Sequence, residues 1–125
     1  MKKTVSAKDL PAALGPYSHA VWAGDFLYCS GQLGLDPATG AMAGSGVSSQ
    51  TERAIENIAA LLASQGLALT DVVKSMVFLA DMGDFKAFNE AYGKYFPSEP
   101  PARSCVGVAA LPAGALVEIE VVAHK

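Results

Sequence analysis

An amphipathic segment at residues 49–65 does most to constrain the fold of this 125-residue chain. Its apolar side chains recur at i, i+3, i+4 and i+7 and form one stripe along a predicted helix: Ile55, Ile58, Ala59 and Leu62. Ser49 and Glu52 have the spacing of a capping box, and Gly66 suits the position that follows a helix. The helix would rise about 26 Å, which is enough to cover one face of a β-sheet.

The segment before this helix predicts short antiparallel strands. Residues 21–29 read as a hairpin whose turn is a Gly-Asp pair, with apolar and aromatic residues on both sides. Thr4-Val5 is a candidate for a short preceding strand. Residues 35–46 contain Asp-Pro-Ala-Thr-Gly and further glycines, and they therefore predict a loop.

The segment after the helix predicts a strand, a second helix and two more strands. Residues 71–82 are apolar enough for a central strand, and Asp84 is placed to cap a helix that Pro97 ends. One side of this second helix carries Phe85, Phe88, Ala91, Tyr92 and Tyr95. Residues 103–108 and 115–123 predict the last strands. The order β-β-β-α-β-α-β-β indicates an α+β fold, with a single mixed sheet and two helices packed on one face.

Length and composition narrow the functional classes. The chain is short enough for one domain, spanning residues 1–125, and 51% hydrophobic content in so small a domain favours association of subunits. The formal net charge is −3 and no basic run follows Lys2-Lys3, which argues against nucleic acid as the main partner. No segment approaches the ~18 apolar residues of a membrane span, so no membrane partner is expected.

The cysteines predict neither a disulfide framework nor a metal site. Cys29 and Cys105 belong to no CxxC or Cys/His cluster, so no metal is expected and the chain is expected to be cytoplasmic with reduced thiols. Cys29 is expected in the core. Cys105 shares a strand face with Arg103, and a neighbouring guanidinium can lower the pKa of a thiol. Neither histidine, His19 or His124, offers the relay that nucleophilic catalysis by Cys105 would need.

Arg103 opens an apolar run that otherwise reads as a buried strand, directly after Pro100-Pro101. A guanidinium keeps its proton, so burying it without an anionic partner is costly, and its planar fork matches a carboxylate. Arg103 is therefore a candidate anchor for a small carboxylate ligand. From the residues alone, a structural salt bridge to Glu118 or Glu120 and a strand-end arginine facing solvent are the alternatives.

Other candidate site residues lie on predicted strands and turns. Glu118 and Glu120 are two apart on a strand and point to the same face, where they are either solvated or part of a site. Tyr17 follows Gly-Pro, a rigid turn that can present its ring to a cleft or leave it at the solvent boundary. Gly31 would let a ligand approach the backbone, and Ser30 could donate a hydrogen bond, although Ser-Gly is also an ordinary turn pair.

Asn89 lies within the second predicted helix and is expected to face away from its aromatic side, as a surface amide. Sequence patterns of a Ser-His-Asp triad, a P-loop, a dinucleotide-binding loop and a metal-ligand cluster are absent. The candidate chemistry therefore depends on the arginine, the glutamates and the residues around them.

Several blocks along almost the whole chain resemble the RidA/YjgF family. They occur in the family's order and comprise residues 15–18 and 30–32, then Asn57-Ile58 with residues 73–79, and finally residues 101–106, 110–112 and 117–121. The resemblance implies the fold shared with one class of chorismate mutases. It also implies a homotrimer with ligand clefts between subunits.

The resemblance further implies a 2-iminobutanoate/2-iminopropanoate deaminase, which needs no cofactor and hydrolyses small enamine and imine acids to 2-oxo acids and ammonia. By this resemblance, Arg103 of this chain would bind the substrate carboxylate, and Glu118 would position a water. The other residues implied to contact the substrate are Tyr17, Ser30, Gly31, Asn89 and Cys105. Some members are labelled endoribonuclease or translation inhibitor, and a non-catalytic module that binds small carboxylates is a third hypothesis.

Overall fold

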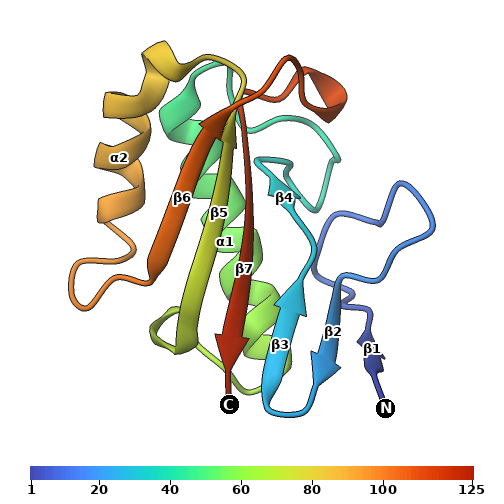
Figure 1. Cartoon of the computed structure of the whole chain (residues 1–125). Coiled ribbons are helices and arrows are strands. Elements are labelled where there is room, and N and C mark those ends of the chain that lie inside the picture. Colours follow the sequence, from blue (N-terminus) through green and yellow to red (C-terminus); the bar gives the residue numbers. More distant parts are fainter.

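The computed structural model describes all residues 1–125 and has one mixed β-sheet with two helices against it (Figure 1). The strand order is β1-β2-β3-β7-β5-β6, and the short strand β4 also pairs with β7. β5 and β6 pair in parallel, whereas the other pairs are antiparallel. The bounds are β1 Lys3–Val5, β2 Ala20–Ala23, β3 Phe26–Cys29, β4 Gln32–Leu33, α1 Val47–Ser64, β5 Val72–Leu79, α2 Phe85–Gly93, β6 Ala102–Gly107 and β7 Val117–His124. The predicted α+β fold is confirmed, and β4 is an element that the pattern did not predict.

Helix α1 buries the predicted apolar stripe, but its predicted capping box is wrong. The helix begins at Val47, and the N-cap residue Gly46 provides no side-chain cap. Ser49 lies inside the first turn, where its hydroxyl donates to the Gly46 carbonyl at 3.1 Å. Val47 is buried in the core, and its packing starts the helix earlier than the local cap signal indicates.

The end of α1 is as predicted. Gly66 has a φ of +75°, a conformation that favours glycine. Its N–H donates to the Ala63 carbonyl at 3.1 Å, and the Leu67 N–H donates to the Leu62 carbonyl at 2.9 Å. These are the hydrogen bonds of a Schellman motif, which satisfies carbonyls at the helix end.

Helix α2 buries Phe88, Ala91 and Tyr92, but its predicted cap is also wrong. Asp84 occupies the N-cap position without a side-chain hydrogen bond. Asp81 instead accepts from the Gly83 N–H at 2.8 Å, at the start of the 3₁₀ turn that leads into the helix. The helix ends at Gly93, before the Pro97 that was expected to stop it.

Strand β7 shows how the sheet separates core from site. Val117, Ile119 and Val121 are at most 2% exposed and belong to the core beneath the helices. Because side chains alternate along a strand, Glu118 and Glu120 point to the face without helices. The predicted assignment of these two faces is confirmed, and the face that carries the glutamates is called here the open face.

Candidate active site

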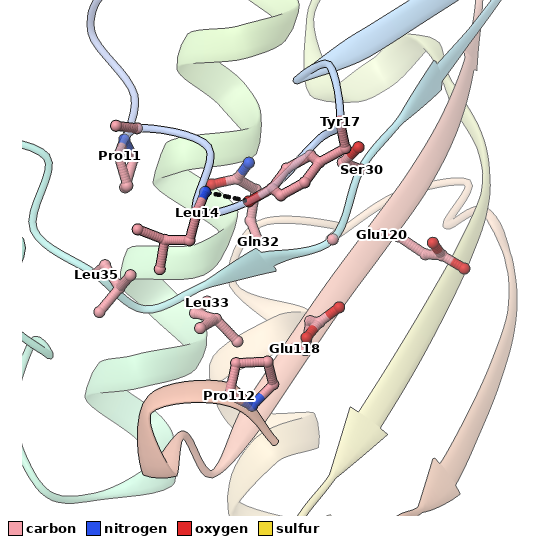
Figure 2. A pocket seen from close by; sticks show the side chains of 12 residues that line it. Pro11, Leu14, Tyr17, Ser30, Gln32, Leu33, Leu35, Pro112, Glu118 and Glu120 are labelled. Atoms are coloured by element: carbon pink, nitrogen blue, oxygen red, sulfur yellow. Dashed lines mark hydrogen bonds between the residues drawn. The ribbon is translucent and has the colours of Figure 1, made fainter.

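A cavity of about 450 Å³ brings several of the predicted site residues together (Figure 2). Its polar lining includes Ser30, Glu118 and Glu120, and the Tyr17 ring lies on its rim. The apolar part of its lining includes Pro11, Leu14, Leu33, Leu35 and Pro112. The cavity thus pairs carboxylates with an apolar wall, which suits a small ligand with a proton donor or a positive charge better than a polyanion.

A bulge between β3 and β4 presents Ser30 and Gly31 to this cavity. Both strands pair with β7, with Tyr28 opposite Val122 and Gln32 opposite Ile119. The stretch that leads to Gln32 therefore contains one residue more than the facing stretch of β7. Such an insertion interrupts the ladder and bends the strand, which frees backbone groups next to a site.

Gly31 lies directly against the side chain of Glu118. A Cβ at position 31 would lie 2.8 Å from the carboxyl carbon of Glu118 and closer still to its Oε2. Only glycine leaves room for this carboxylate. Gly31 was expected to let a ligand approach the backbone, and within one chain the group that approaches it is the Glu118 carboxylate.

The environment of Glu118 weakens its acidity. Burial raises the pKa of the Glu118 carboxyl above its ordinary value, and the charge of Glu120 raises it further. A carboxylate with a raised pKa is a better proton acceptor near neutral pH than an exposed one. Glu118 is thus a candidate proton acceptor.

Tyr17 is held at the rim of the cavity by its own loop. Its hydroxyl accepts from the Leu14 N–H at 3.3 Å, and its N–H donates to the Gly15 carbonyl at 2.9 Å. The side chain is half exposed, so its ring forms part of the wall.

Arg103 lies on the other face of the sheet, away from this cavity. In the parallel pair its register partner is Ser75, which is fully buried on the helix side. Its guanidinium carbon lies 5.0 Å, 5.4 Å and 5.8 Å from the ring centroids of Tyr92, Phe88 and Phe85 in α2. These distances allow cation–π contacts, which hold the guanidinium without using its N–H groups.

Arg103 makes no ion pair within the chain. The salt bridges join Arg53 to Glu56 and Lys94 to Glu52. The alternative of a structural salt bridge to Glu118 or Glu120 is therefore wrong, because the glutamates project from the opposite face. Arg103 is half-buried, and its N–H donors therefore remain available to an anion.

The ring nearest to the guanidinium is fixed by a buried hydrogen bond. The hydroxyl groups of Tyr92 and Ser75 lie 2.7 Å apart, and Ser75 is also the register partner of Arg103. This pair joins α2 to β5 directly beneath the arginine. Neither Ser75 nor Tyr92 was predicted as part of the site, because their pairing depends on how α2 packs on the sheet.

Asn89 and Cys105 lie on the arginine side and not in the cavity. Asn89 is half-buried, four residues after Phe85 and three before Tyr92, so it borders the aromatic side of α2. Asn89 was expected to be a surface amide facing away from that side, and it is half-buried at the border of that side. Burial raises the pKa of the Cys105 thiol, and the opposing effect of Arg103 is smaller.

Three further features concern the second cysteine, metal binding and the membrane. Cys29 is buried as predicted, and burial raises its pKa to about 12. No three His, Cys, Asp or Glu side chains cluster in a way that could hold a metal ion. Neither helix combines the length and the apolar character that crossing a membrane requires.

Comparison with known proteins places the chain in a family. Residues 7–125 match the family model described as endoribonuclease L-PSP. The chain is 48% identical to RutC family protein SSO3206 of Saccharolobus solfataricus over 100% of its own length and 99% of that protein. It is 46% identical to the 2-iminobutanoate/2-iminopropanoate deaminase of Bos taurus, over 98% of this chain and 90% of that protein.

A solved structure agrees with these matches. RidA from the Antarctic bacterium Psychrobacter sp. PAMC 21119 superposes with a TM-score of 0.94 at 43% identity, over 98% of this chain and 99% of that one. The RidA/YjgF resemblance of the sequence blocks is thereby confirmed. The chain belongs to the endoribonuclease L-PSP family, together with these RutC and RidA proteins.

Proposed function

We propose that this protein is a deaminase that hydrolyses small 2-imino acids, and the enamines in equilibrium with them, to 2-oxo acids and ammonia. The observation that carries the proposal is the Arg103 guanidinium, which rests against three aromatic rings and has no anionic partner in its own chain. Its free N–H groups match the carboxylate of such a substrate. The relative from Bos taurus, named for this activity, supports the same reaction class.

Glu118 supplies the second part of the reaction. The carboxylate accepts a proton from water as the water oxygen bonds to the iminium carbon, which gives a neutral carbinolamine. Glu118 returns this proton to the nitrogen, and the carboxylate then accepts the hydroxyl proton as the C–N bond breaks, ammonia leaves and the carbonyl forms. An iminium carbon is already electrophilic, so this sequence requires no cofactor. The raised pKa of Glu118 suits these proton transfers.

One chain does not bring these two parts together, because Arg103 and the cavity lie on opposite faces of the sheet. The proposed site therefore forms between copies, with Arg103, Cys105 and Asn89 of one copy closing the cavity of the next. Large apolar side chains on the open face support such contacts: Phe26 and Tyr28 are 41% and 51% exposed, and Val106 is 40% exposed. A ring of copies, as in the homotrimer that the family resemblance implies, would cover them.

Cys105 is assigned to the lining of this site and not to covalent chemistry. A nucleophilic cysteine needs a low pKa, and burial moves the pKa of this thiol in the opposite direction. Tyr17, Ser30 and Gly31 complete the pocket around the substrate on the glutamate side.

A nuclease is the main rival, because the family description is endoribonuclease L-PSP. The cavity carries Glu118 and Glu120 but no lysine or arginine, and the whole chain has a net charge of −3. Both features repel a phosphate backbone. A carboxylate-binding module without catalysis is the third hypothesis, and it differs from the proposal only in turnover.

The test is a coupled assay. A serine dehydratase generates 2-aminoacrylate, and the rate of 2-oxo acid formation is followed with and without this protein. The Arg103→Ala variant is the matched control. Acceleration by the native protein alone supports the proposal. If neither protein accelerates 2-oxo acid formation and only the native protein binds pyruvate, the protein is a carboxylate-binding module and the proposed deaminase function is wrong. RNA is also incubated with an equimolar amount of each protein. Cleavage by the native protein but not by Arg103→Ala would favour the nuclease.

A further inference from the structure

The loop between β1 and β2 spans residues 6–19 and contains no helix or strand, and its part before His19, residues 6–18, forms one wall of the cavity. Figure 2 shows Pro11, Leu14 and Tyr17 of this loop around the mouth of the cavity. Leu10 is buried in the core and provides an apolar anchor near its middle. His19, at the end of the loop, forms hydrogen bonds to the backbone on both sides of this anchor.

His19 is 5% exposed and uses both ring nitrogens on the loop backbone. Its Nδ1 accepts from the Ala7 N–H at 3.0 Å, so this nitrogen carries no proton. Its Nε2 lies 3.0 Å from the Pro11 carbonyl and donates to it. One neutral imidazole therefore bridges the two sides of the Leu10 anchor.

The backbone around His19 is tied to the bulge that carries Gly31. The His19 carbonyl accepts from the Ser30 N–H at 2.9 Å. The Ser30 hydroxyl donates to the Ser18 carbonyl at 2.6 Å. The loop wall and the glutamate side of the cavity are thus joined through Ser18 and His19, which both bond to Ser30.

We propose that His19 is a positioning residue of this site, whose imidazole holds the β1–β2 loop in the conformation that places Tyr17 and Leu14 around the substrate. Both hydrogen bonds of its ring go to the loop backbone, and it forms no ion pair with a carboxylate. Without the ring, the Ala7 N–H and the Pro11 carbonyl lose partners that are shielded from water. Leu10 would keep the loop near the core but would not set the positions of its two flanks. The substrate in this inference rests on the proposed function, whereas the loop contacts do not.

Three variants separate the two hydrogen bonds. His19→Asn places an acceptor oxygen near the position of Nδ1 and keeps only the bond from Ala7. His19→Gln places a donor nitrogen near the position of Nε2 and keeps only the bond to Pro11. His19→Leu keeps neither. Lys8→Ala is the matched control, because Lys8 is exposed on the same loop, forms no ion pair and does not line the cavity.

Two readouts are used on the full-length protein. Hydrogen exchange of the peptide that covers residues 6–18 reports the loop without any need for activity, with the peptides of α1 as internal reference. Steady-state kinetics with an imine generated in situ gives KM and kcat separately. For His19→Leu we expect faster exchange confined to residues 6–18 and a KM raised about tenfold, with kcat within about twofold. His19→Asn and His19→Gln should lie between it and the native protein.

The inference is overturned if loop exchange and KM stay unchanged in His19→Leu. It is also overturned if exchange accelerates across α1 as well, or if kcat falls as much as KM rises, since His19 would then stabilise the whole fold. If His19→Leu does not fold, the same two measurements on His19→Asn and His19→Gln test the inference by the same criteria. If the native protein lacks deaminase activity, the proposed function fails, and hydrogen exchange still tests whether His19 holds the loop.

Discussion

The carboxylate of Glu118 occupies the space that a side chain on Gly31 would fill. A Cβ there would lie 2.8 Å from the Glu118 carboxyl carbon. The glycine lies in the bulge between β3 and β4, and the glutamate lies on β7, which pairs with both. The position of the proposed base therefore depends on a residue without a side chain.

Substitution of Gly31 should displace this base. In Gly31→Ala the methyl group forces the Glu118 carboxylate away, and an error of about 1 Å in a catalytic group lowers kcat about a hundredfold. Gly93→Ala is the control, because a Cβ there meets nothing within 4 Å. Assays of kcat with circular dichroism of both variants test this; native kcat in Gly31→Ala would show that the contact has no role in turnover.

Arg103 and Glu118 should fail in different ways. Glu118→Gln keeps the shape but cannot accept a proton, so kcat should fall about a hundredfold or more while 2-oxobutanoate still binds. Arg103→Ala should abolish that binding, and Arg103→Lys should weaken it because an ammonium lacks the bidentate fork. Calorimetric titration with 2-oxobutanoate distinguishes the roles. Equal loss of binding in the arginine and glutamate variants would refute this division of labour.

Sites that form between copies should show complementation. When Arg103→Ala and Glu118→Gln chains are unfolded together and refolded as a mixture, random assembly leaves about one quarter of the sites with both native groups. Activity should therefore reappear in the mixture, although each variant alone is inactive. Light scattering should give the mass of a trimer. An inactive mixture of well-folded trimers would contradict the shared site.

The pH dependence should follow Glu118. Its pKa is raised, so the basic carboxylate is lost at a higher pH than usual, and kcat/KM should fall as the pH drops through this value. Because Glu120 is one cause of the shift, Glu120→Gln should move the acidic limb to lower pH. Rate profiles from about pH 4 to pH 8 for native and variant enzyme check the sign, since the substrate titrates identically in both. A limb that moves upward would exclude Glu118 as the titrating base.

Cys105→Ser should retain most of the activity. Water is the proposed nucleophile, and the half-buried thiol has a raised pKa that disfavours thiolate. The measurement is kcat/KM beside that of Arg103→Ala, with thermal unfolding to verify the fold. A loss as large as that of the arginine variant would instead indicate thiol chemistry.

Local periodicity predicted both helices and the core-facing sides of α1 and β7. The stripe of Ile55, Ile58 and Leu62 predicted the buried side of α1, because residues three and four apart share a helix face. Alternation along β7 predicted that Glu118 and Glu120 leave the core together. Local signals failed at both helix starts, where the packing of Val47 and the turn before α2 determine the first residue.

Tertiary structure decided how the candidate residues are grouped. Pairing of β6 with β5 puts Arg103 opposite buried Ser75 and so on the helix side, away from Glu118, and no local pattern encodes this long-range register. The bulge at Ser30 and Gly31 and the two hydrogen bonds of His19 likewise join segments far apart in the chain. The sequence by itself therefore predicted which residues are candidates for the proposed site. Their positions relative to one another follow from strand pairing and packing, because those interactions act between residues that are distant in sequence.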